Sequence, residues 1–148
     1  MAPEPSPLEQ ATAALARRDR SAAGLVAYLE RRGTPREDAT RAVARLTQAG
    51  YVDDARFALR RAEVLAERGH GDAPIRYALA REGVAADDVE LALRELTPER
   101  ERAVDLLRGD APRLRAIRRL AAKGFAADSI EAALAAFDDL ESVEGDVR

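Results

Sequence analysis

The chain has 148 residues, with 24 Lys and Arg against 27 Asp and Glu, one His and no Cys, giving a net charge of -3. This length allows one compact domain or a short array of repeats, and the lack of cysteine excludes a disulfide scaffold, a thiolate metal site and a thiol nucleophile. Because the sequence shows neither a basic leader with an apolar segment nor an apolar run long enough for a bilayer, we expect a cytoplasmic protein without membrane contact.

The composition predicts a chain made of helices. Ala, Leu, Arg and Glu, which favour helices, dominate the sequence, and no useful run alternates polar and apolar residues as a strand does. The apolar periodicity predicts nine helices, at residues 8–18, 22–32, 35–49, 54–68, 73–82, 86–96, 98–108, 112–123 and 127–140.

The ends of these helices carry their own signals. Glycines just past an amphipathic run predict left-handed helix ends at Gly33, Gly50, Gly69, Gly83, Gly109 and Gly124. Thr34-Pro35 and Thr97-Pro98 predict starts in which the threonine hydroxyl is the N-cap and the proline follows in the first turn. Ser21, Asp53 and Asp72 are further predicted caps.

An internal repeat appears when Gly33, Gly83 and Gly124 are superposed, and it extends over about 22 residues without gaps. Leu29, Leu79 and Leu120 precede these glycines by four residues, so each copy is a helix pair that buries the same seam. We therefore predict an all-α, elongated and curved array of tandem three-helix repeats, in three copies of which the last is truncated. Its predicted organisation is a disordered tail (1–7), an N-terminal helix (8–20), three repeats (21–70, 71–110, 111–140) and a disordered tail (141–148).

The sequence gives little support to catalysis. His70 stands in a glycine turn without a second His or a Cys, and the serines lack the context of a nucleophile. The acidic pairs Asp53-Asp54, Asp87-Asp88 and Asp138-Asp139 are suggestive of a metal site, but the first two pairs open predicted helices, where carboxylates cap free N–H groups. We expect no catalytic residue, no cofactor and no metal.

Basic residues gather on one face of the predicted helix 112–123. Arg115, Arg118, Arg119 and Lys123 lie opposite Leu114, Ile117, Leu120 and Ala121, without an intervening acid. The face is either a solvated surface of an arginine-rich chain or a contact for phosphates or an acidic partner. A weaker second candidate combines Arg17, Arg18 and Arg20 with Arg31, Arg32 and Arg36. The aromatic residues Tyr51, Phe57 and Phe125 are predicted to fill the seams between helix pairs.

The string from Gly50 to Ala58, Gly-Tyr-Val-Asp-Asp-Ala-Arg-Phe-Ala, resembles the most specific motif of the RecX family of bacterial recombinase regulators. Residues 75–84 and 118–125 are similar to the family's second and third repeat signatures. Asp72-Ala73-Pro74 departs from the Gly-Pro that the family often has there, and the third repeat has no evident third helix. Together with the repeat glycines, the structural motif residues are Gly33, Gly50, Tyr51, Asp53, Asp54, Phe57, Gly83, Leu120, Gly124 and Phe125.

The resemblance implies tandem three-helix repeats and a non-enzymatic function. It implies binding to the RecA recombinase filament on DNA and modulation, usually inhibition, of filament growth, ATP hydrolysis and strand exchange. An elongated, curved helical array fits the groove of a helical filament, where it contacts several protomers at once. We accordingly expect the RecA filament as partner, with DNA as a second contact, and a monomeric chain. Two alternatives stay open: a direct DNA-binding protein with helix-turn-helix-like repeats, and a helical-repeat scaffold for another protein.

Overall fold

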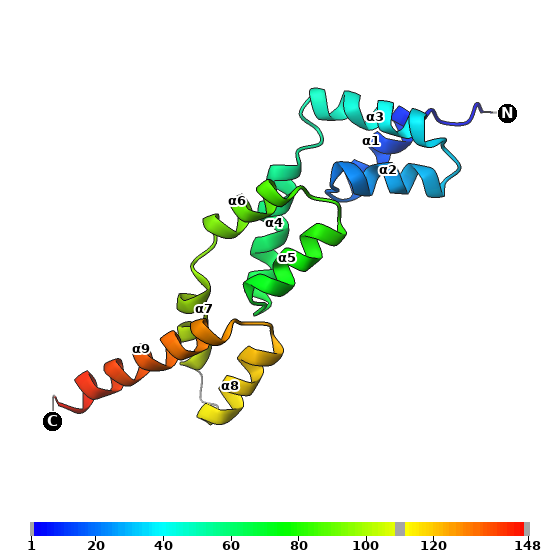
Figure 1. Ribbon diagram of the computed structural model, residues 1–148. Helices are drawn as coiled ribbons and strands as arrows, with labels where there is room; N and C mark the ends of the chain where they lie inside the picture. Colours follow the sequence, from blue (N-terminus) through cyan, green and yellow to red (C-terminus); the bar gives the residue numbers. More distant parts are fainter. Residues whose placement is uncertain (1, 109–111, 147–148) are drawn as a thin grey trace. The chain divides into compact units, whose positions relative to one another are not determined.

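Figure 1 shows the computed structural model, which describes residues 2–108 and 112–146. In these residues all regular structure is helical, so the all-α prediction is confirmed. The helices are α1 (Pro7–Arg17), α2 (Ala22–Arg31), α3 (Arg36–Gln48), α4 (Asp54–Glu67), α5 (Asp72–Arg81), α6 (Ala86–Glu95), α7 (Glu99–Leu107), α8 (Arg113–Ala122) and α9 (Ala127–Gly145). None of these described helices is long and apolar enough to cross a membrane.

Every predicted helix boundary lies within one residue of the observed boundary, except the last. Helix α9 continues past the predicted end at Leu140, so residues Glu141 to Gly145 are helical and the predicted disordered tail is wrong there. The segment contains no proline and no glycine before Gly145, so no stop signal ends the helix at Leu140, and its side chains are exposed. The boundaries and number of the predicted repeats stay predictions.

The predicted helix starts divide into two groups. Ser21 is the N-cap of α2, where its side chain accepts a hydrogen bond from the Gly24 N–H, and the Asp53 carboxylate accepts one from the Arg56 N–H. The threonine caps are wrong, because Pro35 and Pro98 themselves are the N-caps of α3 and α7, without a side-chain cap. Proline already has the extended ψ of a cap, 142° at both positions, and the helix starts one residue later than predicted.

Asp72 is also placed differently from the prediction. It is the first residue of α5 rather than its cap, and its carboxylate accepts a hydrogen bond from Arg102 of α7.

The glycine turns confirm the predicted left-handed helix ends. The backbone φ is 93° at Gly33, 78° at Gly83 and 80° at Gly124, and it is also positive at Gly50 and Gly69. After each of the three repeat glycines, the next N–H donates to the carbonyl of the leucine four residues before the glycine, which is the Schellman arrangement. Gly109 lies outside the described residues.

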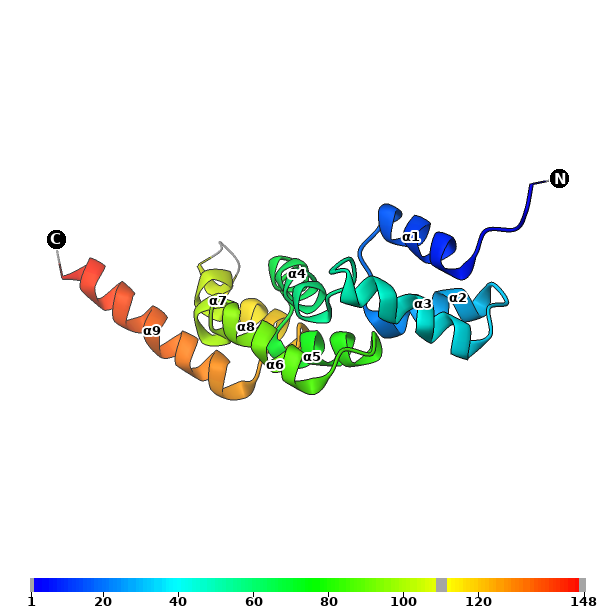
Figure 2. The same cartoon turned by 90° about the horizontal axis from the view of Figure 1, so that it is seen from above.

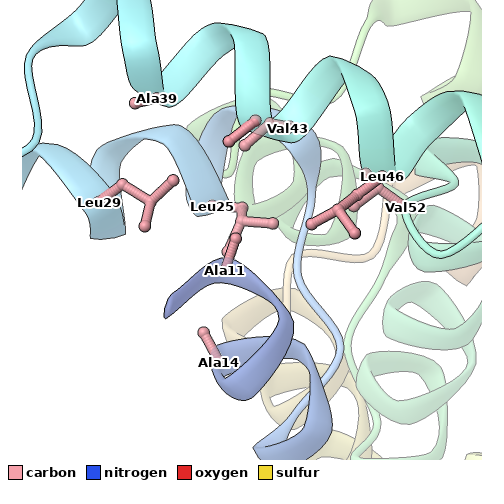
Figure 3. Packing of buried hydrophobic residues seen from close by; sticks show 9 residues of the cluster. Ala11, Ala14, Leu25, Leu29, Ala39, Val43, Leu46 and Val52 are labelled. Carbon is pink, nitrogen blue, oxygen red and sulfur yellow. The ribbon is translucent and has the colours of Figure 1, made fainter. Parts of the chain in front are cut away.

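The helices form two compact units, each with its own core. Unit 1 comprises Met1–Arg61 with Leu79–Ala92, and unit 2 comprises Ala62–Ala78 with Leu93–Arg148. In unit 1, α1, α2 and α3 pack on one another around a cluster that is mostly alanine and leucine (Figures 2 and 3). The cluster consists of Ala11, Ala14, Leu25, Leu29, Ala39, Ala42, Val43, Leu46 and Val52.

In unit 2, α7 packs along α9, and α8 contacts both helices. Their shared cluster consists of Ala103, Leu107, Ala116, Leu120, Phe125, Ile130 and Ala133. The small side chains of alanine let the helix axes approach closely, so a chain with few large apolar residues still encloses a core.

Two of the three aromatic predictions are confirmed. Phe57 and Phe125 are 9% and 6% exposed, whereas Tyr51 is 68% exposed, so its predicted place in a seam is wrong. The N–H groups of Tyr51 and Val52 both donate to the Leu46 carbonyl, at 2.9 and 3.3 Å. This turn directs Val52 into the core and leaves the Tyr51 ring in solvent.

Candidate partner-binding surfaces

Helix α8 carries the first candidate surface. Ala116 and Leu120 hold the helix on the core of unit 2, while Arg115, Arg118 and Arg119 are exposed. None of these three arginines forms an ion pair with any of the residues that the structure describes. We call them the α8 arginines. They are a concentrated positive surface that meets no carboxylate in the described part of the chain.

The apolar side of α8 differs in part from the prediction. Leu114 is 59% exposed, so only part of the predicted apolar face is committed to the core. Arg113 forms two contacts with the Asp138 carboxylate of α9, at 2.7 and 2.9 Å, both on the protein surface. This hydrogen-bonded pair lowers the pKa of Asp138 and raises that of Arg113, which removes Arg113 from the set of available cations.

Lys123 is only partly available for a partner. It is the C-cap of α8, it is half-buried, and its Nζ lies 3.5 Å from the Arg68 carbonyl oxygen. Lys123 and Arg119 also line a small cavity of about 140 Å³ on the side of α8 that faces Arg68 and Leu106. Of the four predicted basic residues, the three α8 arginines are therefore exposed together, whereas Lys123 already contacts the Arg68 carbonyl.

The second predicted basic cluster is divided by the fold. Arg36 lies 3.7 Å from Glu30, and Arg32 lies over the Tyr28 ring, 5.1 Å from its centre. Arg31, by contrast, lines a cavity of about 520 Å³ in unit 1 together with Arg18 and Arg20. We call this hollow the arginine cavity.

The arginine cavity is also lined by two arginines that the sequence analysis did not predict. They are Arg61 of α4 and Arg81 of α5. Arg81 stands two residues before Gly83, as Arg31 stands two residues before Gly33, so the internal repeat contains a signal for Arg81. No comparable signal exists for Arg61, which comes to the cavity only because the first part of α4, up to Arg61, belongs to unit 1.

The arginine cavity contains fewer negative than positive charges. Asp19 and Glu82 are its two carboxylates, against five arginines. Glu82 accepts a hydrogen bond from the Nε of Arg61 at 3.2 Å, and Asp19 lies 3.8 Å from a guanidinium nitrogen of Arg60. Glu82 is therefore hydrogen-bonded, whereas the Asp19 Oδ2 atom has only this ion pair and accepts no hydrogen bond among the described residues.

Arg20 is the most confined cation of the cavity. Its guanidinium lies 4.5 Å from the centre of the Tyr28 ring, and its buried Nε has no hydrogen-bond partner among the described residues. Burial lowers the pKa of Arg20, and the positive charge of Arg18 lowers it further. A group with these surroundings gains free energy when an anion approaches it.

Hydrogen bonds between helix ends position the wall of the cavity. The Ser21 hydroxyl donates to the Glu82 carbonyl at the end of α5, and the Asp54 carboxylate accepts from the Ala22 N–H at the start of α2. Ser21, only 2% exposed, thus joins the cap of one helix to the glycine turn of another.

The same arrangement recurs in unit 2. The Gly71 N–H donates to the Lys123 carbonyl at 2.9 Å, and the Glu99 carboxylate accepts from the Asp72 N–H at 2.8 Å. Gly71 and Ser21 both stand twelve residues before a repeat glycine, and Glu99 and Asp54 both begin a helix. The helix pairs are thus equivalent in contacts as well as in sequence.

Comparisons with known proteins give clear relatives, although no family model matches the chain. The regulatory protein RecX of Stenotrophomonas maltophilia (strain R551-3) is 36% identical over 140 residues, which cover 88% of this chain and 86% of that protein. The regulatory protein RecX of Xanthomonas campestris pv. campestris (strain B100) is also 36% identical, over 93% of this chain and 90% of that protein.

Solved structures agree on the fold. The crystal structure of RecX from Lactobacillus salivarius matches with a TM-score of 0.76 at 19% identity and covers 89% of this chain and 94% of that one. A second crystal structure, of a regulatory protein RecX, matches with a TM-score of 0.70 at 23% identity, over 84% and 68% of the two chains.

The described residues form an all-helical protein in which a helix pair with a glycine turn recurs and arginines are exposed on the surface. Its relatives are 36% identical over most of both chains. The chain belongs to the RecX family of regulatory proteins.

Proposed function

We propose that this protein regulates the RecA recombinase by occupancy and not by catalysis. It binds the RecA filament on DNA, in the filament groove, and inhibits filament growth, ATP hydrolysis and strand exchange. The observation that carries the proposal is membership of the RecX family, whose relatives are named as regulatory proteins.

The α8 arginines are the surface that we assign to this contact. A recombinase filament on DNA offers phosphates and acidic side chains, and the planar guanidinium group binds either anion through two parallel hydrogen bonds. Three exposed arginines without an ion pair among the described residues retain their full capacity for such contacts. Lys123 contributes less, because it already contacts the Arg68 carbonyl.

The direct test measures ATP turnover by RecA on single-stranded DNA with increasing amounts of this protein. We expect turnover to fall in a saturable manner. Unchanged turnover at saturating protein would reject the proposal, and increased turnover would reject inhibition while keeping regulation.

A charge variant tests the assigned surface. The triple change of Arg115, Arg118 and Arg119 to Ser removes three exposed cations that hold no ion pair in the described structure, so thermal unfolding should stay close to that of the parent. The half-inhibitory concentration should rise about tenfold or more, as expected when charge-assisted hydrogen bonds are removed. The control changes Arg94, Arg100 and Arg108 to Ser, three exposed arginines of the same unit, of which Arg108 has a surface ion pair with Asp105 at 3.8 Å, and should inhibit as the parent does.

Binding to naked duplex DNA distinguishes the two kinds of anion. If the α8 arginines bind phosphates, the salt dependence of binding should flatten by up to about 0.9 for each phosphate that is no longer neutralised. If they bind acidic RecA side chains, filament binding should weaken without this change. Undiminished inhibition by a folded triple variant would show that the α8 arginines are only a solvated face.

A further inference from the structure

The arginine cavity of unit 1 is not explained by the surface assigned to the recombinase. It combines three cations that have no carboxylate partner among the described residues, namely Arg18, Arg20 and Arg31. Such a group has an electrostatic cost, because like charges repel and Arg20, which is half-buried, gives up part of its hydration. The repulsion between the three positive charges is reduced when an anion binds among their side chains.

The cavity is larger than a lone anion requires. Its volume of about 520 Å³ falls within the range of pockets that hold small organic ligands. Small and apolar residues, Ala23, Ala27 and Phe57, also line the hollow. A ligand that fills it therefore carries both an anionic group and a flat, weakly polar body.

We propose that the arginine cavity binds one nucleotide. The phosphate lies against the guanidinium groups of Arg18, Arg20 and Arg31, none of which has a carboxylate partner among the described residues. The sugar and base lie against Ala23, Ala27 and Phe57. The nucleotide is either free in solution or one unit of a single strand, because a base inside a duplex stays stacked and paired.

Arg20 is held ready for this contact before the ligand arrives. The Tyr28 ring supports its guanidinium from one side, at 4.5 Å, so little side-chain freedom remains to be lost on binding. Ser21, directly after Arg20, is fixed by its bonds to Gly24 and Glu82. The backbone that carries the cation is therefore rigid.

The experiment uses the full chain, without RecA, and two probes. A labelled oligothymidylate reports strand binding by fluorescence anisotropy, and thymidine monophosphate reports binding of a free nucleotide by calorimetry. The test variant combines Arg18→Gln with Arg31→Gln, both exposed. Its matched control combines Arg17→Gln with Arg45→Gln, two exposed arginines of the same unit that do not line the cavity, which removes the same charge.

We expect the test variant to bind the probe about tenfold more weakly or worse and the control to stay within about twofold of the parent. For the strand, the salt slope should also flatten by about 0.7 if one phosphate is no longer neutralised. A second variant, Ala27→Leu, fills the cavity without changing charge and should weaken binding equally, which diffuse attraction to arginine does not predict.

The outcomes are separable. Binding of both probes assigns the site to free nucleotides as well as strands, and binding of the oligomer alone assigns it to strands. Equal losses in the test and control variants, no effect of Ala27→Leu in a folded protein, or no binding of either probe would overturn the proposal. Equally tight cavity-dependent binding of a glutamate-rich peptide would overturn the assignment to phosphate. Because RecA is absent, none of these results depends on the proposed regulation.

Discussion

Gly33, Gly83 and Gly124 share a left-handed backbone, but their surroundings differ. A Cβ atom added at Gly33 would meet nothing within 4 Å. A Cβ at Gly83 would collide with the Ala23 side chain, and one at Gly124 would collide with the Pro74 ring. Two of these glycines therefore have a second role, because they allow another helix to approach the turn.

The contrast predicts different costs for the same substitution. Gly33→Ala should lower the free energy of unfolding by about 1 to 2 kcal/mol, through the left-handed backbone penalty alone. Gly83→Ala and Gly124→Ala should lower it by a further 1 to 3 kcal/mol or so, because the added methyl overpacks the contact. Urea unfolding of the three variants measures this, and equal losses at all three positions would show that the close approach carries no cost.

Tyr51 illustrates how a single residue escapes prediction. An aromatic ring directly after a helix end favours burial, but the turn at Gly50 puts Val52 in the core instead. Arg56 lies within 3.5 Å of the Gly50 carbonyl and 3.3 Å of the Tyr51 carbonyl, which fixes the turn. The orientation of the ring is thus decided by backbone bonds made after the helix ends.

Among the elements, α7 is tied to two other helices through its first residue. One carboxylate oxygen of Glu99 accepts from the Asp72 N–H at the start of α5, at 2.8 Å. The other accepts from the Ser129 hydroxyl of α9 and lies 3.4 Å from the Ala126 N–H. A single carboxylate therefore satisfies donors at the starts of two helices, where the helix dipole also favours negative charge.

This role predicts a specific loss for Glu99→Gln. The amide keeps the size of the side chain but offers only one acceptor oxygen, so one set of donors is left without a partner. We expect the free energy of unfolding to fall by about 1 to 2 kcal/mol. Glu101→Gln, in the same first turn but exposed, is the control and should change it by less than about 0.5 kcal/mol. A similar loss in both variants would show that the effect comes from removing a negative charge at the start of α7 and not from the hydrogen bonds of Glu99.

At the scale of the whole molecule, the two basic surfaces belong to different units. The α8 arginines lie in unit 2, and the arginine cavity lies in unit 1. The net charge is -3, so local arrangement, and not total charge, supplies the sites for anions. Attraction to nucleic acid should therefore depend on a few named arginines.

The separation predicts additive effects on filament binding. A protein that combines the triple change of the α8 arginines with Arg18→Gln and Arg31→Gln should lose binding free energy equal to the sum of the two separate losses, within about 0.5 kcal/mol. Affinity for RecA filaments on single-stranded DNA, measured for the parent, the two variants and their combination, provides the test. A combined loss far from the sum would show that the two surfaces act on one shared contact.

The sequence by itself determined the helices, their glycine ends and the leucines of the seam. These features follow from short-range chemistry, because helix propensity, glycine at positive φ and apolar spacing act within a few residues. Even the α8 arginines could be found, since one helix wheel contains them all. The same local rules were wrong for the threonine caps, where proline has cap geometry of its own, and for the end of α9, where no stop signal follows Leu140.

Only the tertiary structure decided which arginines share a cavity. Arg18 and Arg31 are close in sequence to the motif residues, but Arg61 and Arg81 join them from α4 and α5. It also decided that Arg36 is paired with Glu30 and that Asp54 and Glu99 cap helices other than their own. These pairings join residues that the chain separates, and they form because packing apolar faces places polar groups opposite one another. No local pattern records which groups will meet.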